Sequence, residues 1–151
     1  MKLSTKYFGS IDCEAEDVLS FPKGLFAYED EHTFLLLPFA GSNGTLLCLQ
    51  SACTPELAFV AMDPFALSPA YAPGLSPEEL RFIQAEDVHE LCFYVLCAVK
   101  NPVADSTVNL KCPIVLNPRT HQAMQVILDG GPYEMRHPLS EFERQEAGKI
   151  C

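Results

Sequence analysis

The chain has 151 residues, 48% of them hydrophobic, which is enough for one domain to bury a core without disulfides or a structural metal. Its 20 acidic residues outnumber its 10 lysines and arginines and give a net charge of −10. Proteins hold nucleic acid by neutralising phosphates with lysine and arginine, so this balance argues against direct RNA or DNA binding. It suits a basic protein partner, whose encounter an acidic surface speeds, although excess acid also simply keeps a domain soluble.

Apolar runs bounded by glycine, proline and asparagine predict about eight strands with short connections. In chain order they are residues 3–11, 18–21, 32–40, 45–51, 57–62, 91–99, 107–117 and 124–128. The third and fourth are separated by Gly41-Ser42-Asn43-Gly44, which has the composition of a hairpin loop. This pattern is typical of a mainly all-β domain, an antiparallel barrel-like fold or sandwich, with one or two short helices.

One helix is well signalled between the fifth and sixth strands. Ser76 is a good N-cap, Pro77 suits the first helical position, and Glu79 completes a capping box. Leu75 and Leu80 can close a hydrophobic staple over this start. We therefore predict a helix that begins at Pro77.

The two longest apolar patterns come later in the chain. Residues 91–99 are apolar on both faces, which predicts a central strand with cover on each side. Residues 107–117 alternate apolar and polar side chains, as in a half-buried strand, with Pro113 marking a bulge or a sheet edge. Residues 117–120 then predict a turn into the last strand.

The end of the chain is more polar than the rest. We expect a β-barrel-like domain over residues 1–136 and a polar tail over residues 137–151. A weaker capping box from Ser140 to Glu143 predicts a second short helix in that tail.

Seven cysteines fit neither a disulfide framework nor a metal site, because their number is odd and no CxxC occurs. Cys92 and Cys97 lie at odd separation in one strand, so they should face opposite ways and cannot share a metal. We expect free thiols that pack as small apolar side chains. The start of the chain lacks the apolar core of a signal peptide, and the longest apolar run, 91–99, is too short to span a membrane. These features predict a soluble, cytoplasmic protein.

Catalytic motifs are missing from the sequence: there is no GxSxG elbow, Gly-rich phosphate loop or HExxH. The four histidines are scattered, and Asp63 before Pro64 is typical of a turn. We predict no enzyme activity, no cofactor and no metal. The alternative is a small β-barrel ligand-binding domain or enzyme with a pocket at the barrel mouth, in which residues 91–99 would form a wall around a flavin or lipid.

Acidic residues in loops are the first candidate partner-binding groups, because loops are where partners reach a rigid scaffold. They form two clusters: Glu14, Glu16 and Asp17, and Glu29, Asp30 and Glu31. Further acids follow the predicted helix start, where they also favour the helix dipole. Each cluster can equally be an ordinary solvated surface.

Amides within apolar strands are the second candidates. Gln50 and Asn109 can present hydrogen-bonding groups at a binding face, or they can fix strand register and turn backbone from within, as can Asn117 and Gln125. The sequence leaves both interpretations open. A buried amide without partners would cost about 1–3 kcal/mol.

Four segments in this order resemble the FliW family of flagellar assembly factors. They are residues 21–25 (FPKGL) with Glu29 after them, 49–51 (LQS), 58–64 (AFVAMDP) and 107–117 (TVNLKCPIVLN). The resemblance extends from about Tyr7 to about Arg136. The chain departs from the family pattern at Phe26-Ala27-Tyr28, where a glycine-containing sequence is expected.

The resemblance implies a cytoplasmic, monomeric, antiparallel β-barrel-like protein that binds two protein partners in turn. One is flagellin, held through its terminal helical region before export. The other is CsrA, a small dimeric RNA-binding regulator that represses flagellin translation and that the released family member antagonises. A general export chaperone unrelated to CsrA is a further alternative.

Overall fold

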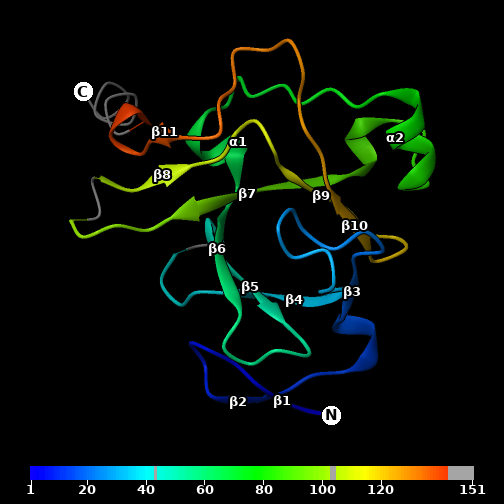
Figure 1. Ribbon diagram of the computed structural model, residues 1–151, viewed down its shortest axis with the longest axis vertical. Helices are drawn as coiled ribbons and strands as arrows, with labels where there is room; N and C mark the ends of the chain where they lie inside the picture. The colour runs from blue at the N-terminus through cyan, green and yellow to red at the C-terminus, as the bar shows by residue number, and fades with distance from the viewer. Residues whose placement is uncertain (43, 103–104, 143–151) are drawn as a thin grey trace.

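The computed structural model describes residues 1–42, 44–102 and 105–142 (Figure 1). Its strands are β1 (Lys2–Ser4), β2 (Ser10–Asp12), β3 (Leu19–Ser20), β4 (Thr33–Pro38), β5 (Leu46–Ser51), β6 (Ala58–Met62), β7 (Cys92–Ala98), β8 (Thr107–Val108), β9 (Ile114–Asn117), β10 (Gln122–Gln125) and β11 (His137–Pro138). Its helical elements are α1 (Pro64–Leu67), α2 (Pro77–Phe82) and the 3-10 turns η1 (Ala15–Asp17) and η2 (Val88–Glu90). No helix among the described residues is long and apolar enough to cross a bilayer.

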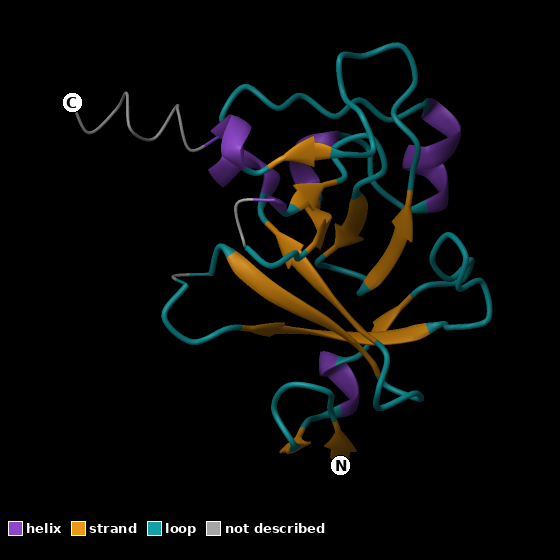
Figure 2. Ribbon diagram, turned by 60° about the vertical axis from the view of Figure 1, so that its left-hand side comes forward, coloured by secondary structure: helices purple, strands orange, loops and turns teal. Residues whose placement is uncertain are grey.

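Seven strands close into a barrel in the order β7-β6-β5-β4-β3-β10-β9, because β9 pairs back onto β7. The ladders are antiparallel, apart from one parallel contact between Gln122 on β10 and Ser20 on β3. Figure 2 shows the strands gathered in the middle, with loops and short helices around them. The predicted mainly all-β, antiparallel barrel-like fold is confirmed; closure leaves the barrel strands without free edges.

The barrel interior is packed with apolar side chains from all seven strands. The fully buried members include Phe34, Leu49, Ile114 and Leu116, and Phe21 and Leu25 join them from the loop after β3. Filling by side chains is usual in a barrel this small. In the described part of the chain, the interior is therefore occupied by the protein itself.

Strand β7 has apolar cover on both faces, as residues 91–99 predicted. Its even-numbered residues belong to the barrel interior, whereas Phe93 and Val95 belong to a second cluster outside the barrel. The segment between β6 and β7 and the chain after β10 cover this outer cluster, contributing residues such as Tyr71, Ile83 and Leu128. Cys92 and Cys97 fall in different clusters, so the expectation that they face opposite ways is confirmed.

Two strand predictions were wrong. Residues 3–11 are not one strand but a hairpin, in which β1 pairs antiparallel with β2 and Gly9 adopts a φ of 67°. Residues 107–117 divide into β8 and β9, because a turn intervenes in which the Cys112 amide donates to the Asn109 side-chain oxygen over 2.9 Å. Val108, Leu110 and Cys112 are buried, as the alternation indicated, but β9 is buried on both faces, so the half-buried pattern holds only for residues 107–112.

The predicted helix start is confirmed. Ser76 Oγ accepts from the Glu79 amide over 3.1 Å, while the Glu79 carboxylate accepts from the Ser76 amide over 2.8 Å. Asp63 forms the expected turn as the N-cap of α1, accepting from the Phe65 amide over 2.9 Å.

The first residues of the predicted tail join the folded domain. β11 pairs with β8, residues 140–142 are helical, and Phe142 is buried in the outer cluster. The second predicted helix therefore starts at Ser140, and the remainder of the expected tail, including Cys151, lies outside the described residues.

Candidate functional site

The loop of residues 21–31, between β3 and β4, is an exposed segment with several internal and tertiary hydrogen bonds, and we call it the docking loop. Gly24 adopts a φ of 67°, and a Cβ there would lie 2.6 Å from the Tyr28 carbonyl oxygen, so only glycine fits. Leu25 and Tyr28 exchange backbone hydrogen bonds of 3.2 and 2.8 Å. Ala27, between them, has a φ of 72°, which costs a non-glycine residue about 1–2 kcal/mol. The FPKGL segment thus folds into a narrow turn anchored by buried Phe21 and Leu25.

Side chains from neighbouring segments form hydrogen bonds with this loop at two places. The Glu31 carboxylate accepts hydrogen bonds from Ser51 Oγ at 2.5 Å and Thr54 Oγ1 at 2.7 Å. The bonds from Ser51 and Thr54 hold the pKa of Glu31 below its ordinary value. Near the middle of the loop, Gln125 accepts from the Phe26 amide over 2.9 Å and donates to the Cys112 carbonyl over 3.1 Å. The loop is therefore held in one conformation.

What the docking loop presents to solvent is an aromatic pair beside two acids. Phe26 is 44% exposed and Tyr28 is 42% exposed. Glu29 and Asp30 next to them are exposed. The loop's lysine, Lys23, lies over the Phe82 ring at 4.3 Å from its centroid. Exposed aromatic residues with uncompensated carboxylates suit a basic protein partner.

Asn109 is connected to this loop indirectly, through Phe59. It is half-buried and lines a 350 Å³ pocket with Phe59, Met135 and Arg136, and Phe59 packs edge-on against Tyr28 with ring centroids 5.2 Å apart. Its side-chain oxygen is already engaged by the Cys112 amide. Asn109 thus shapes a turn and also borders a surface pocket.

Gln50 does not face a partner, because it is completely buried. Its oxygen accepts from the Lys6 amide over 2.9 Å, and its nitrogen donates to the carbonyls of Ser51, Pro55 and Leu57 over 3.0 to 3.2 Å. Gln50 therefore fixes the turn after β5 against the N-terminal hairpin. The same turn carries the Thr54 hydroxyl that holds Glu31, so Gln50 supports the docking loop from within.

The other acidic cluster lies around η1. Glu14, Glu16 and Asp17 are all exposed, and the Asp17 carboxylate accepts from the Glu14 amide over 2.8 Å. Asp17 therefore shapes this turn, while Glu14 and Glu16 face solvent. The structure does not bring this cluster into contact with the docking loop through any hydrogen bond among the described residues.

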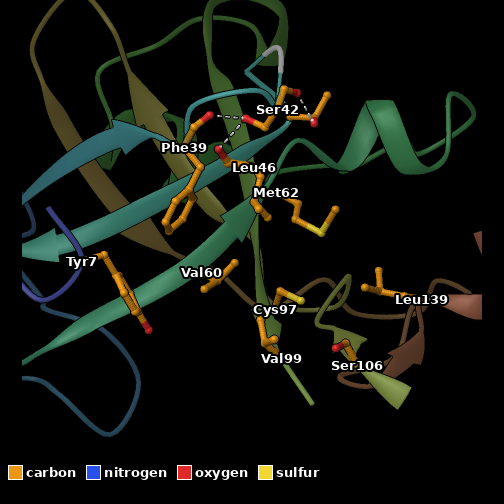
Figure 3. A pocket seen from close by; sticks show the side chains of 11 residues that line it. Tyr7, Phe39, Ser42, Leu46, Val60, Met62, Cys97, Val99, Ser106 and Leu139 are labelled. Carbon is orange, nitrogen blue, oxygen red and sulfur yellow. Dashed lines mark hydrogen bonds between the residues drawn. The ribbon is translucent and has the colours of Figure 1, made fainter. Parts of the chain in front are cut away.

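A second surface, which we call the apolar groove, lies on the outer face of the barrel (Figure 3). Val60, Met62 and Cys97 on β6 and β7 form its floor. Tyr7 and Phe39 stand on one side, and Ser106 and Leu139 on the other, as Figure 3 shows. Its volume is 550 Å³ and none of its described lining residues is lysine, arginine, aspartate or glutamate.

Sequence reasoning missed this groove, because its walls come from both ends of the chain and only the fold brings them together. Sequence reasoning also gave no sign that Tyr71 is an internal anchor. Tyr71 is 4% exposed and donates from its hydroxyl to the Leu110 carbonyl over 2.7 Å, and burial raises its pKa. The prolines around it, Pro69 and Pro73, predict an irregular segment and do not indicate that Tyr71 is buried.

Cys13, Cys48 and Cys112 are buried, as expected for thiols that pack as apolar side chains, whereas Cys53 is exposed. Burial raises the pKa of Cys48 to about 11 and also raises the pKa values of Cys97 and Cys112, so these thiols stay protonated at neutral pH. Within the described ranges, no three His, Cys, Asp or Glu residues are grouped to hold a metal ion.

Proteins related to this chain in sequence and in fold are known. A family model described as FliW protein matches residues 2–139. Flagellar assembly factor FliW from Caldanaerobacter subterraneus subsp. tengcongensis is 35% identical over 141 residues, covering 93% of this chain and 94% of the relative. The protein of that name from Geobacillus kaustophilus is 36% identical, covering 92% and 95%. A crystal structure of the flagellar assembly factor FliW superimposes with a TM-score of 0.85 at 34% identity, covering 92% of this chain and 96% of that one.

Proposed function

This chain belongs to the FliW family of flagellar assembly factors, and on that premise we propose that it binds flagellin and CsrA in turn in the cytoplasm. Flagellin that awaits export occupies the protein and leaves CsrA free to repress flagellin translation. Once flagellin is exported, the released protein captures CsrA, and translation resumes. Each step is reversible docking by a monomer, with no catalytic residue, cofactor or nucleic-acid contact.

The observation that carries this proposal is the rigid docking loop. A surface already fixed in one conformation loses little conformational entropy on binding, so less of the interaction free energy of its exposed groups is offset by ordering. Phe26 and Tyr28 supply apolar area, and Glu29 and Asp30 supply negative charge. An RNA-binding regulator must carry lysine and arginine for RNA, so it complements this charge.

The apolar groove complements the other partner. The terminal region of flagellin is helical, and an amphipathic helix offers an uncharged ridge of the kind that lies in such grooves. Val99, 55% exposed at the groove, would contact that ridge. The two partners would then bind different faces, so mutual exclusion requires coupling between the two binding sites. Each 1.4 kcal/mol of coupling free energy changes the affinity for the other partner tenfold.

Substitutions at the two faces test this assignment. Reversal of Glu29 and Asp30 to lysine should weaken CsrA binding at least tenfold, whereas Val99→Glu should weaken flagellin binding and leave CsrA unaffected. Glu31 and Asp17 are left unchanged, because both hold local backbone. Ile127→Glu, at a site 47% exposed, is the matched control for Val99→Glu, and the pair Glu14→Lys with Glu16→Lys tests the other acidic cluster separately. Normal CsrA affinity in the Glu29 and Asp30 variant would remove the docking loop from this interface.

A further inference from the structure

A separate pocket lies beside α1, and we call it the aromatic pocket. It has a volume of 580 Å³ and is lined by Phe65, Tyr71 and Phe93, with Val88 and His89 at η2. The Phe65 ring centroid lies 5.7 Å from that of Tyr71 and 6.2 Å from that of Phe93, both in edge-to-face geometry. Phe65 is nevertheless 41% exposed, so part of its ring faces solvent at the pocket.

None of the described residues that line this pocket is acidic, but acidic residues adjoin its lining residues Val88 and His89 in the chain. His89 lies 2.6 Å from Asp87 through Nδ1, and the Asp87 side chain is 60% exposed. Hydrogen bonds from the backbone and side chain of His89 lower the pKa of Asp87, so it is ionised at neutral pH. Glu86 and Glu90 are exposed on either side, and Asp63 lines an adjoining pocket that shares Phe65 and Phe93. Among the described lining residues of both pockets there is no lysine or arginine.

A pocket with aromatic walls that adjoins a carboxylate favours a particular side chain. A cation is attracted to an aromatic face, and arginine is favoured because its planar guanidinium stacks on rings and donates paired N–H groups to a carboxylate. The aliphatic stem of an arginine also suits apolar walls. We propose that the aromatic pocket receives an arginine side chain of a basic protein partner, with the guanidinium over Phe65 and paired with Asp87.

This site lies outside the docking loop and the apolar groove, so it adds a third contact that the proposed function does not require. A basic partner would then be recognised by one defined side chain in addition to general charge attraction. Asp87 holds the turn as well, since it accepts from the His89 amide over 2.8 Å. An asparagine oxygen can accept that same bond, which makes Asp87→Asn a change of charge with little change of shape.

A peptide titration tests the proposal without flagellin or CsrA, so its outcome is independent of the proposed function. A peptide of four arginines is added to the isotope-labelled full chain at low salt, and a peptide of four citrullines, equal in shape but uncharged, is the comparison. The amide signals of Val88, His89 and Phe93 should shift to saturation with arginine only. Phe65→Leu and Asp87→Asn should each weaken the affinity read from these signals about three- to tenfold.

Matched controls separate the pocket from general charge attraction. Phe26→Leu removes an equally exposed ring elsewhere, and Asp12→Asn removes an exposed carboxylate on β2; both should leave that affinity unchanged. Equal shifts with citrulline, shifts confined to other residues, or normal affinity in the Asp87→Asn protein would overturn the proposal. If Phe65→Leu lowers the melting temperature, Asp87→Asn alone decides.

Discussion

Replacing Gln50 by leucine distinguishes an internal support from a binding amide. Leucine has similar bulk but cannot bond the Lys6 amide or the carbonyls of Pro55 and Leu57, which Gln50 reaches at 2.9 to 3.2 Å. The Lys6 amide and the Pro55 carbonyl would then lack a partner, whereas the Leu57 carbonyl still accepts from the Ser51 amide over 3.0 Å. Each of the two buried groups left without a partner costs about 1–3 kcal/mol. We take the lower end, because the turn after β5 is near the surface, and subtract about 1 kcal/mol for the more apolar side chain.

The net loss is then roughly 1 kcal/mol, which in a domain of this size lowers the melting temperature by roughly 2–4 °C. Calorimetry of Gln50→Leu beside Gln122→Leu, the same change at a half-buried position on β10, measures it. The control should change stability by less than about 0.5 kcal/mol. Unchanged stability in Gln50→Leu, with partner binding lost, would refute the internal role and assign the amide to an interface.

Three further predictions concern the docking loop. Gly24→Ala should lower the free energy of unfolding by more than about 2 kcal/mol in urea titration, because the added Cβ would clash with the Tyr28 carbonyl. The control is Gly41→Ala, where the added Cβ has open space and only the positive φ costs stability, about 1 kcal/mol. Equal losses in the two variants would contradict the predicted clash at Gly24. Ala27→Gly should raise stability by up to about 1 kcal/mol, since it relieves a φ of 72°; a loss of stability would show that no strain is stored there. The lowered pKa of Glu31 means that its carboxylate stabilises the fold above the unfolded-state pKa of about 4.3 and loses this effect as pH falls. The stability gap between the natural protein and Glu31→Gln should therefore shrink below about pH 5, and a gap independent of pH would exclude this linkage.

Features with a local cause could be predicted from the sequence. The capping box at Ser76 involves residues three apart, and the two apolar faces of β7 follow from its composition alone. Alternation correctly indicated the buried side chains in residues 107–112, whereas all of β9 is buried and the half-buried strand predicted there was wrong. The alternation did not indicate pairing, because Leu110 and Cys112 enter the interior from a turn as readily as from a strand.

The candidate site was predictable only in part. The exposure of Glu29 and Asp30 was expected from their position in a loop, whereas the engagement of Glu31 by Ser51 and Thr54 depends on strand neighbours that sequence does not reveal. Ala27 occupies a left-handed position where glycine is usual, which gives a physical reason for the glycine expected in the family at this turn. The apolar groove is formed by segments from both ends of the chain, and the aromatic pocket by residues between Phe65 and Phe93 that come together only in the fold, so no local pattern predicts either one.

Competition between the two partners tests the central claim most directly. CsrA binding to the purified chain is measured with and without saturating flagellin. The measurement is made by calorimetry in solution or by surface binding to the immobilised chain. We expect each partner to bind alone at micromolar concentration or below, and flagellin to weaken CsrA binding at least tenfold, with the reciprocal effect of equal size. Failure to bind either protein, or simultaneous binding with unchanged affinities, would contradict the account.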